Sequence, residues 1–261
     1  HLPPDHRSRG IERGGIDAVG TLVLAVTLGA YALATTLGRG HFGGVNALLL
    51  LVAVCGVGLF VLAEGSASAP LVPADTFRDP ALSAGLVTSA LVSAVMMTTL
   101  VVGPFYLSRA LGVTATVAGV ALSAGPLAAA VSGVPAGRLV DRLGAPRMSI
   151  AGLVGLFCGA SALFLIPSTS GLPGYIAPVV AMTVSYAVFQ AANNAALMGE
   201  APTDRRGLVA GLLGLSRNVG LITGAAVMGA VFALASASTD VGAAAPGAVA
   251  AGMRTTFGVA A

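Results

Sequence analysis

The chain is too apolar for an ordinary water-soluble protein. Of its 261 residues, 56% are hydrophobic and only 9% are charged, whereas soluble domains carry about 25% charged residues. The net charge of +3 comes from arginines in short gaps between apolar runs. Because they form no basic face, nucleic acid is excluded as the expected partner, and a lipid bilayer is expected as the surroundings.

The elements expected along the chain are long apolar helices. A membrane span needs about 20 mostly apolar residues to cross about 30 Å of hydrocarbon. The runs are too long for membrane strands and lack their period-two alternation. The sequence therefore predicts an all-α membrane protein, a polytopic helix bundle. Seven complete spans are expected at residues 18–37, 45–63, 81–107, 113–136, 148–167, 175–198 and 207–235, and a partial eighth at 247–261.

The arginines between these runs predict the orientation of the chain. The loops on one side hold only Arg39 and Arg109. Since arginine-rich loops stay in the cytoplasm, we expect a multi-pass protein whose N-terminal end is cytoplasmic. The arginines on the cytoplasmic side are Arg7, Arg9, Arg13, Arg78, Arg138, Arg142, Arg147, Arg205 and Arg206.

One long connection, residues 64–80, divides the chain. Its Ser and Pro content predicts a flexible cytoplasmic linker. We expect residues 1–64 to hold a cytoplasmic lead-in and two spans, and residues 65–80 to form the linker. Residues 81–261 then form a bundle of five complete spans and a truncated sixth. The chain begins with His1 and its last apolar run is short, so we interpret it as a fragment of a longer protein.

The sequence offers little for catalysis. None of the histidines His1, His6 and His41 lies in an apolar run, and none has a paired acid or nucleophile nearby. A phosphate-binding loop with lysine is impossible, because the chain has no lysine. The two cysteines and the acids have no metal-ligand spacing. We therefore expect no enzyme activity, no cofactor and no metal.

Polar residues inside a span are the default functional candidates. In the sixth run they recur at steps of three and four residues, which places most of them on one stripe of a helix. Two interpretations stay open: hydrogen bonds between helices, or the wall of a water-filled substrate path. The residues are Thr183, Tyr186, Gln190, Asn193 and Asn194.

Arg217 is the deepest charge that we identify. It lies about 15 Å into the seventh run, so it needs a partner or water, or it extends toward the cytoplasmic surface. Its neighbour Asn218, a carbonyl group or an acid outside this chain could be that partner. In the third run, Met96, Met97 and Tyr106 suit either a pliable apolar pocket or plain packing.

Small residues and prolines mark places where helices can pack closely or bend. Gly207 with Gly211, and Gly220 with Gly224, are small pairs four residues apart, which favour close approach of two helices in lipid. The prolines of the fourth run permit kinks.

The stretch "GRLVDRLGAPR", residues 137–147, gathers charges between two apolar runs. We expect a tight cytoplasmic loop that Gly137 and Gly144 allow. Asp141 can favour the start of the next helix or pair with a nearby arginine, so the loop could act as a charge latch. The stretch resembles the cytoplasmic signature loop of the major facilitator superfamily in its second-half copy. The matching residues are Gly137, Leu139, Asp141, Arg142, Gly144 and Arg147, whereas Ala145 and Pro146 depart where the family often has basic residues.

Residues 193–232 extend this resemblance to the fourteen-helix drug:proton antiporter group of that superfamily. The resemblance implies the C-terminal half of a major facilitator fold, preceded by two extra central spans. It implies proton-coupled efflux of drugs or other small amphipathic molecules across the plasma membrane by alternating access. The partners are then a small-molecule substrate, protons and a missing N-terminal helical bundle, which holds the proton-titrating acids.

Two other functions stay open. One is export of an endogenous metabolite or a self-made antibiotic, and the other is a non-transporting membrane scaffold or sensor. The resemblance implies a gating role for the 137–147 motif. From the polar and aromatic residues within the spans we expect a substrate path formed by Tyr106, Thr183, Tyr186, Gln190, Asn193, Asn194 and Arg217.

Overall fold

The computed structural model describes residues 18–37, 43–66, 72–236 and 244–261. Throughout these ranges the regular elements are helices, and seven of them are long and apolar enough to cross a membrane. This confirms the predicted spans and the all-α fold. The helices are α1 Ala18–Thr36, α2 Gly44–Ser66, α3 Pro80–Phe105, α4 Ala115–Leu143, α5 Ala145–Leu165, α6 Gly171–Glu200, α7 Arg206–Ala235 and the shorter α8 Pro246–Ala260.

Three short elements complete the described chain. They are a 3-10 helix Ala74–Arg78, a π-helix Tyr106–Ala110 that continues α3, and a 3-10 helix Ser168–Ser170. The first of these lies within the connection expected to be a flexible linker, so part of that linker is helical. The expected cytoplasmic lead-in, Arg39 and the centre of the linker fall outside the described residues.

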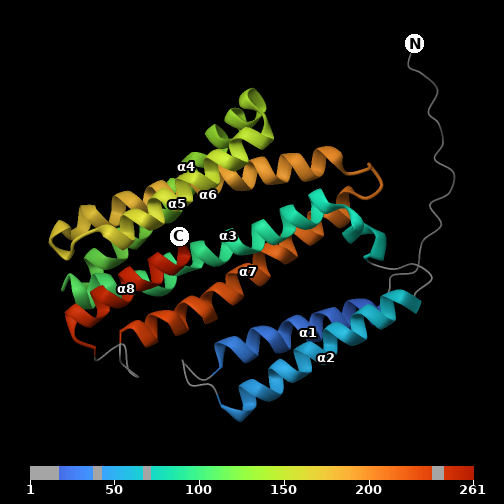
Figure 1. Ribbon diagram of the computed structural model, residues 1–261, viewed down its shortest axis with the longest axis horizontal. Coiled ribbons are helices and arrows are strands. Elements are labelled where there is room, and N and C mark those ends of the chain that lie inside the picture. The colour runs from blue at the N-terminus through green and yellow to red at the C-terminus, as the bar shows by residue number, and fades with distance from the viewer. Residues whose placement is uncertain (1–17, 38–42, 67–71, 237–243) are drawn as a thin grey trace.

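Helix α3 lies between α7 and α6 (Figure 1). Helices α4 and α5 pack on α6, and α8 packs against α7 and α5. The α1–α2 pair lies on the far side of α7 from α6 (Figure 1). The start of α3 follows from its local sequence, because the Asp79 carboxylate accepts a 2.9 Å hydrogen bond from the Ala81 N–H and Pro80 begins the helix.

Glycines bring α7 and α3 into backbone contact. A methyl group added at Gly220 would lie 2.1 Å from the Ala90 carbonyl oxygen, and one at Gly224 would lie 2.5 Å from the Ala94 Cα. The prediction of close packing at this pair is confirmed. The other pair behaves differently, because nothing lies within 4 Å of the corresponding positions at Gly207 and Gly211.

The α1–α2 pair is a helical hairpin in which a buried amide bonds one helix to the end of the other. The Asn46 side chain is 5% exposed and donates hydrogen bonds to the Ala34 and Leu37 carbonyl oxygens at the end of α1. These carbonyls have no partner within their own helix. The hairpin meets the bundle where the hydroxyls of Tyr31 and Thr223 lie 2.6 Å apart, so a hydrogen bond joins α1 to α7.

The structure corrects the expected loop at residues 137–147. Helix α4 continues to Leu143, and α5 begins at Ala145, so only Gly144 separates them. Gly144 has φ of 87°, which favours glycine, as expected. Gly137, however, lies inside α4 and takes no part in the turn. The expectation failed because the charged residues suggested a surface loop, although helical backbone continues readily through them.

Candidate substrate path and the 137–147 motif

The polar stripe of α6 faces α3. The Gln190 amide nitrogen donates a 2.8 Å hydrogen bond to the Tyr186 hydroxyl, which lies 3.4 Å from the Ser93 hydroxyl on α3. One to two turns nearer the C-terminal end of α6, the Asn193 amide donates a 3.2 Å bond to the Gly85 carbonyl oxygen. These contacts connect α6 to α3 across the membrane interior.

The members of this stripe differ in exposure. Thr183 is buried and donates a 2.8 Å hydrogen bond to the Val179 carbonyl oxygen of its own helix. Asn193 is buried, Tyr186 and Gln190 are half-buried, and Asn194 is exposed. Asn193 therefore acts between helices, whereas Gln190 and Asn194 also have surface that another molecule can reach.

Helix α3 contributes hydroxyl groups that the sequence analysis did not single out. Ser93 is fully buried and faces Tyr186. Ser89, one turn away, is also buried, and its hydroxyl has no hydrogen-bond partner in the described part of the chain. The four-residue spacing of the two serines places them on one face of α3. Because this helix is mostly apolar, the sequence alone did not distinguish them from residues that only pack.

Arg217 is exposed on α7 and makes no ion pair or hydrogen bond with any described residue. Asn218, one of the candidate partners, bonds instead to the Gly214 carbonyl oxygen of its own helix, at 3.0 Å. Gln190 lies ten residues before the end of α6, and Arg217 lies eleven residues after the start of α7. At 1.5 Å per residue both side chains lie about 15–17 Å from the same end of the bundle.

The contacts of α7 also fix the side on which Arg217 lies. The line of contact with α3 runs through Ser216, Gly220 and Gly224. Thr223, which bonds to α1, and Arg217 lie on opposite flanks of this line, because six residues of a helix separate them by about 120°.

Helix α6 lies on the Arg217 flank of α7. On α3, Ala90 and Ala94 meet α7, while Gly85 and Ser93 meet α6. Helices α3 and α7 run parallel and both are right-handed. The positions of these contact residues around α3 therefore place α6 and the α1–α2 hairpin on opposite sides of α7, as Figure 1 also shows.

On α6, Tyr186 and Asn193 mark the line that contacts α3. At about 100° of helix rotation per residue, Gln190 lies beside this line on the side that faces α7. Gln190 and Arg217 thus flank the same part of α3.

Tyr106 lies apart from this group. It is buried in the π-helix at the other end of α3, thirteen residues or about 20 Å beyond Ser93. Its ring centroid lies 5.6 Å from that of Tyr175, whose hydroxyl donates a 3.3 Å bond to the Thr99 carbonyl oxygen. Met96 is partly buried and packs against the same apolar core. The structure therefore does not bring Tyr106 together with Gln190.

The charged side chains of the 137–147 motif cover the end of α4 and the start of α5. Arg138, Asp141, Arg142 and Arg147 are exposed, as is Leu139, and none of these charges makes an ion pair with a described residue. Asp141 belongs to the last turns of α4 and does not cap α5, which has no acidic residue in its first turn. Pro146 stands in the first turn of α5, where proline suits a helix start.

Between these charges the motif is anchored by apolar contacts. Val140 and Met148 are buried and pack with Ala192 of α6. The apolar contacts thus attach this part of the backbone to α6, while the charged side chains around them are exposed.

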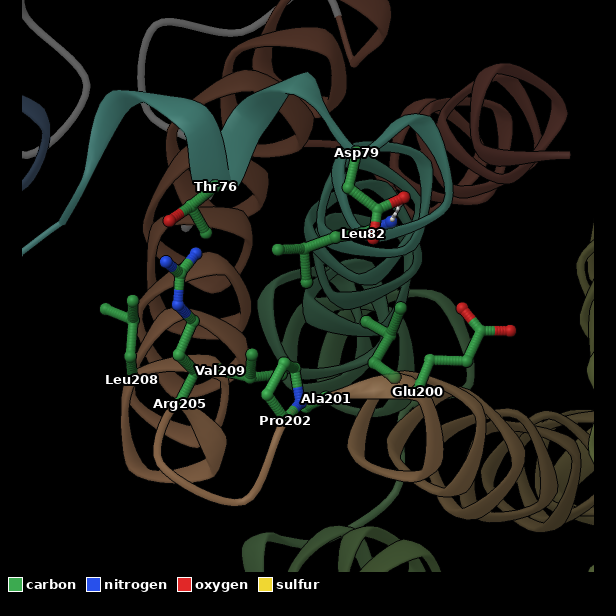
Figure 2. A pocket seen from close by; sticks show the side chains of 10 residues that line it. Thr76, Asp79, Leu82, Glu200, Ala201, Pro202, Arg205, Leu208 and Val209 are labelled. Carbon is green, nitrogen blue, oxygen red and sulfur yellow. Dashed lines mark hydrogen bonds between the residues drawn. The ribbon is translucent and has the colours of Figure 1, made fainter.

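A pocket of about 310 Å³ lies where the 3-10 helix Ala74–Arg78 meets the connection between α6 and α7. Figure 2 shows the side chains of Thr76 and Arg205 pointing toward one another on one side of it, with Glu200 on the other side. The Thr76 hydroxyl is buried and has no hydrogen-bond partner among the described residues. The apolar lining includes Leu82, Leu197 and Val209. No residue expected in the substrate path lines this pocket.

The model of one transporter family, the Major Facilitator Superfamily, matches residues 1–225 and 85–261, two overlapping stretches that together cover the chain. The chain belongs to the major facilitator superfamily. Its spanning helices, together with this family membership, make it a multi-pass membrane protein.

Three relatives in this superfamily are similar over most of the chain. The uncharacterized transporter YebQ of Escherichia coli (strain K12) is 32% identical over 70% of this chain and 40% of its own length. The multidrug resistance protein Stp of Mycobacterium tuberculosis (strain H37Rv) is 28% identical over 83% of this chain and 41% of its own length. The quinolone resistance protein NorB of Staphylococcus aureus (strain MRSA252) is 24% identical over 91% of this chain and 52% of its own length. The chain thus spans about half the length of these relatives.

Proposed function

We propose that this chain is the C-terminal part of a proton-coupled exporter of drugs or similar small amphipathic molecules in the plasma membrane. Family membership supports transport, and the names of Stp and NorB support export of antibacterial compounds. The observation that carries the proposal is the placement of Gln190 and Arg217. Two polar side chains at one depth flank α3 inside a membrane bundle, and both retain accessible surface.

A substrate path explains that accessible surface better than packing alone. Ionisable side chains within a span are costly unless they face water, a partner or a ligand. Arg217 has no partner among the described residues, and Asn194 and Gln190 are not fully enclosed. Transporters of this kind place their substrate site near the bilayer midplane between two helical bundles. In this proposal the described bundle supplies one wall, and a preceding N-terminal bundle supplies the other.

In this proposal the 137–147 motif controls the opening and closing of the two bundles. Its exposed charges lie at the expected cytoplasmic end of α4 and α5, where a second bundle would close against them. Contacts that form in only one arrangement of the bundles bias the equilibrium between the two arrangements. The proton is expected to bind outside this chain, since Asp79, Asp141 and Glu200, like the other acids within the described helices or beside them, lie at helix ends.

The test is transport by the longer protein that contains this chain, purified and reconstituted in vesicles with an imposed proton gradient. A cationic dye such as ethidium and a panel of antibacterial compounds serve as probes. We expect efflux that stops when an ionophore removes the gradient. Efflux that persists without the gradient would contradict proton coupling, and no movement of any probe would contradict drug export.

A further inference from the structure

We infer that Arg217 recognises an anionic group, a carboxylate, on the exported molecule, and that Gln190 and the Tyr186 hydroxyl help to orient it. The inference rests on the proposed export function and adds the class of substrate. It predicts a preference for acidic or zwitterionic amphipathic molecules over purely cationic ones.

The first argument is the sign of the charge. Among the described residues, Arg217 is the charged side chain deep within the cytoplasmic half of the bundle. Arg254 lies eight residues, or about 12 Å, into α8 from the other end of the bundle, close enough to Tyr106 for an electrostatic interaction. Asp141 and Glu200 lie in the last turns of α4 and α6. No described residue therefore supplies a negative charge at the depth of Arg217.

The second argument is the set of groups near that depth. Arg217 presents a planar group of N–H donors that fits a carboxylate in a two-point geometry. The Gln190 amide uses one N–H for Tyr186 and has a second. The Tyr186 and Ser93 hydroxyls lie 3.4 Å apart, so when the buried Ser93 donates to Tyr186, the Tyr186 hydrogen can turn elsewhere. Arg217 and the half-buried Gln190 and Tyr186 can each donate a hydrogen bond to a carboxylate, whereas a cationic substrate would be repelled by Arg217.

The third argument is accessibility. Arg217 is exposed and is held on the α6 flank of α7 by the contacts of Ser216 and Gly220 with α3. The hairpin that bonds to Thr223 covers the opposite flank. A molecule that lies along α3 between α6 and α7 therefore meets Arg217 from one side and Gln190 from the other.

The experiment compares a fluoroquinolone that has a free carboxyl group with its ethyl ester, a pair that differs in this one charge. Their efflux rates are measured with the longer protein in vesicles, together with ethidium as a probe without a carboxylate. The variants are Arg217→Gln, Arg217→Lys and, as a surface control, Arg206→Gln, which removes an exposed arginine at the start of the same helix.

We expect the acid to be exported about tenfold faster than the ester at low concentration, the size of one charge-assisted hydrogen bond. Arg217→Gln should abolish this ratio, Arg217→Lys should keep part of it, and Arg206→Gln should leave it unchanged. Equal export of acid and ester by the unmodified protein would overturn the inference while leaving drug export standing. If Arg217→Gln lowers efflux of acid, ester and ethidium alike, the arginine pairs with a carboxylate of another helix, and the inference is also wrong. If no probe moves, the proposed function itself fails, and the inference fails with it.

Discussion

Gly220 of α7 lies directly against the Ala90 carbonyl of α3, where a single added methyl group would lie 2.1 Å from the oxygen. This contact and the similar one at Gly224 bring together the two helices that carry Arg217 and Ser93. The spacing of the proposed path therefore depends on the absence of side chains at these two positions.

Replacing Gly220 with alanine tests this contact. The clash with the Ala90 carbonyl should force α7 away from α3, and overpacking of this kind lowers the free energy of unfolding by about 1–3 kcal/mol. Gly211→Ala is the matched control, because its methyl group meets open space and alanine favours helix. Thermal unfolding of both variants in detergent measures the difference. Equal midpoints for the two variants would show that the helices tolerate a wider spacing.

Replacing Tyr31 with phenylalanine tests how α1 is attached to the bundle. The variant loses the hydroxyl that lies 2.6 Å from Thr223. Hydrogen bonds between membrane helices contribute about 0.6 kcal/mol on average and at most about 1.7 kcal/mol. A double-mutant cycle with Thr223→Val should recover a coupling energy of this size from chemical unfolding. Thr36→Val, which removes an exposed hydroxyl bonded within its own helix, should show no coupling to Tyr31→Phe.

Cysteines at positions 193 and 194 test which amide of α6 is accessible. Asn193 is buried and bonded to Gly85, whereas its neighbour Asn194 is exposed. In a background without the exposed Cys55 and Cys158, Asn194→Cys should react with a charged, water-soluble thiol reagent far faster than Asn193→Cys. A cysteine at position 190 should react at an intermediate rate and be protected by substrate. If the cysteines at positions 190 and 194 both fail to react, this stripe of α6 contacts other helices or lipid and does not line a water-filled path.

Replacing Asp141 with asparagine tests the gating role of the motif. Asp141 is exposed and makes no ion pair in the part of the chain that the structure describes, so the change should leave membrane expression and unfolding nearly unaltered. If the carboxylate biases one arrangement of the two bundles, efflux should fall by about tenfold, or about 1.4 kcal/mol in the barrier. Asp204→Asn, an exposed acid between α6 and α7, is the control. Unchanged efflux in Asp141→Asn would remove the motif from the mechanism.

The spans were predictable because crossing a bilayer imposes length and hydropathy on each helix separately. The ends of the helices were harder to predict from the sequence. Helix α4 runs through Arg138 and Asp141 to Gly144, although those charges suggested a loop. Arginine and aspartate are compatible with helix once the chain has left the hydrocarbon, so charge marks the edge of the membrane and not the end of the helix.

The candidate site was predictable in its residue types and not in its grouping. The spacing of Tyr186, Gln190 and Asn193 indicated one face of α6. It could not indicate that Asn193 would bond to Gly85, or that Tyr106 would lie about 20 Å from Ser93. Those relations depend on how α3 and α6 are placed in antiparallel contact, which the pattern of a single helix does not contain.

Sequence alone determined that the chain spans a membrane seven times or more and that Arg217 lies deep in a span, because these follow from the order of apolar and charged residues along one helix. Tertiary structure alone decided that Gly220 contacts α3 and that Gly211 faces open space. It also decided that Arg217 of α7 and Gln190 of α6 flank the same part of α3. In lipid, apolar burial gives helices little preference for any one neighbour. The arrangement is instead decided by close packing at small residues and by a few hydrogen bonds between helices, and these exist only once the helices have met.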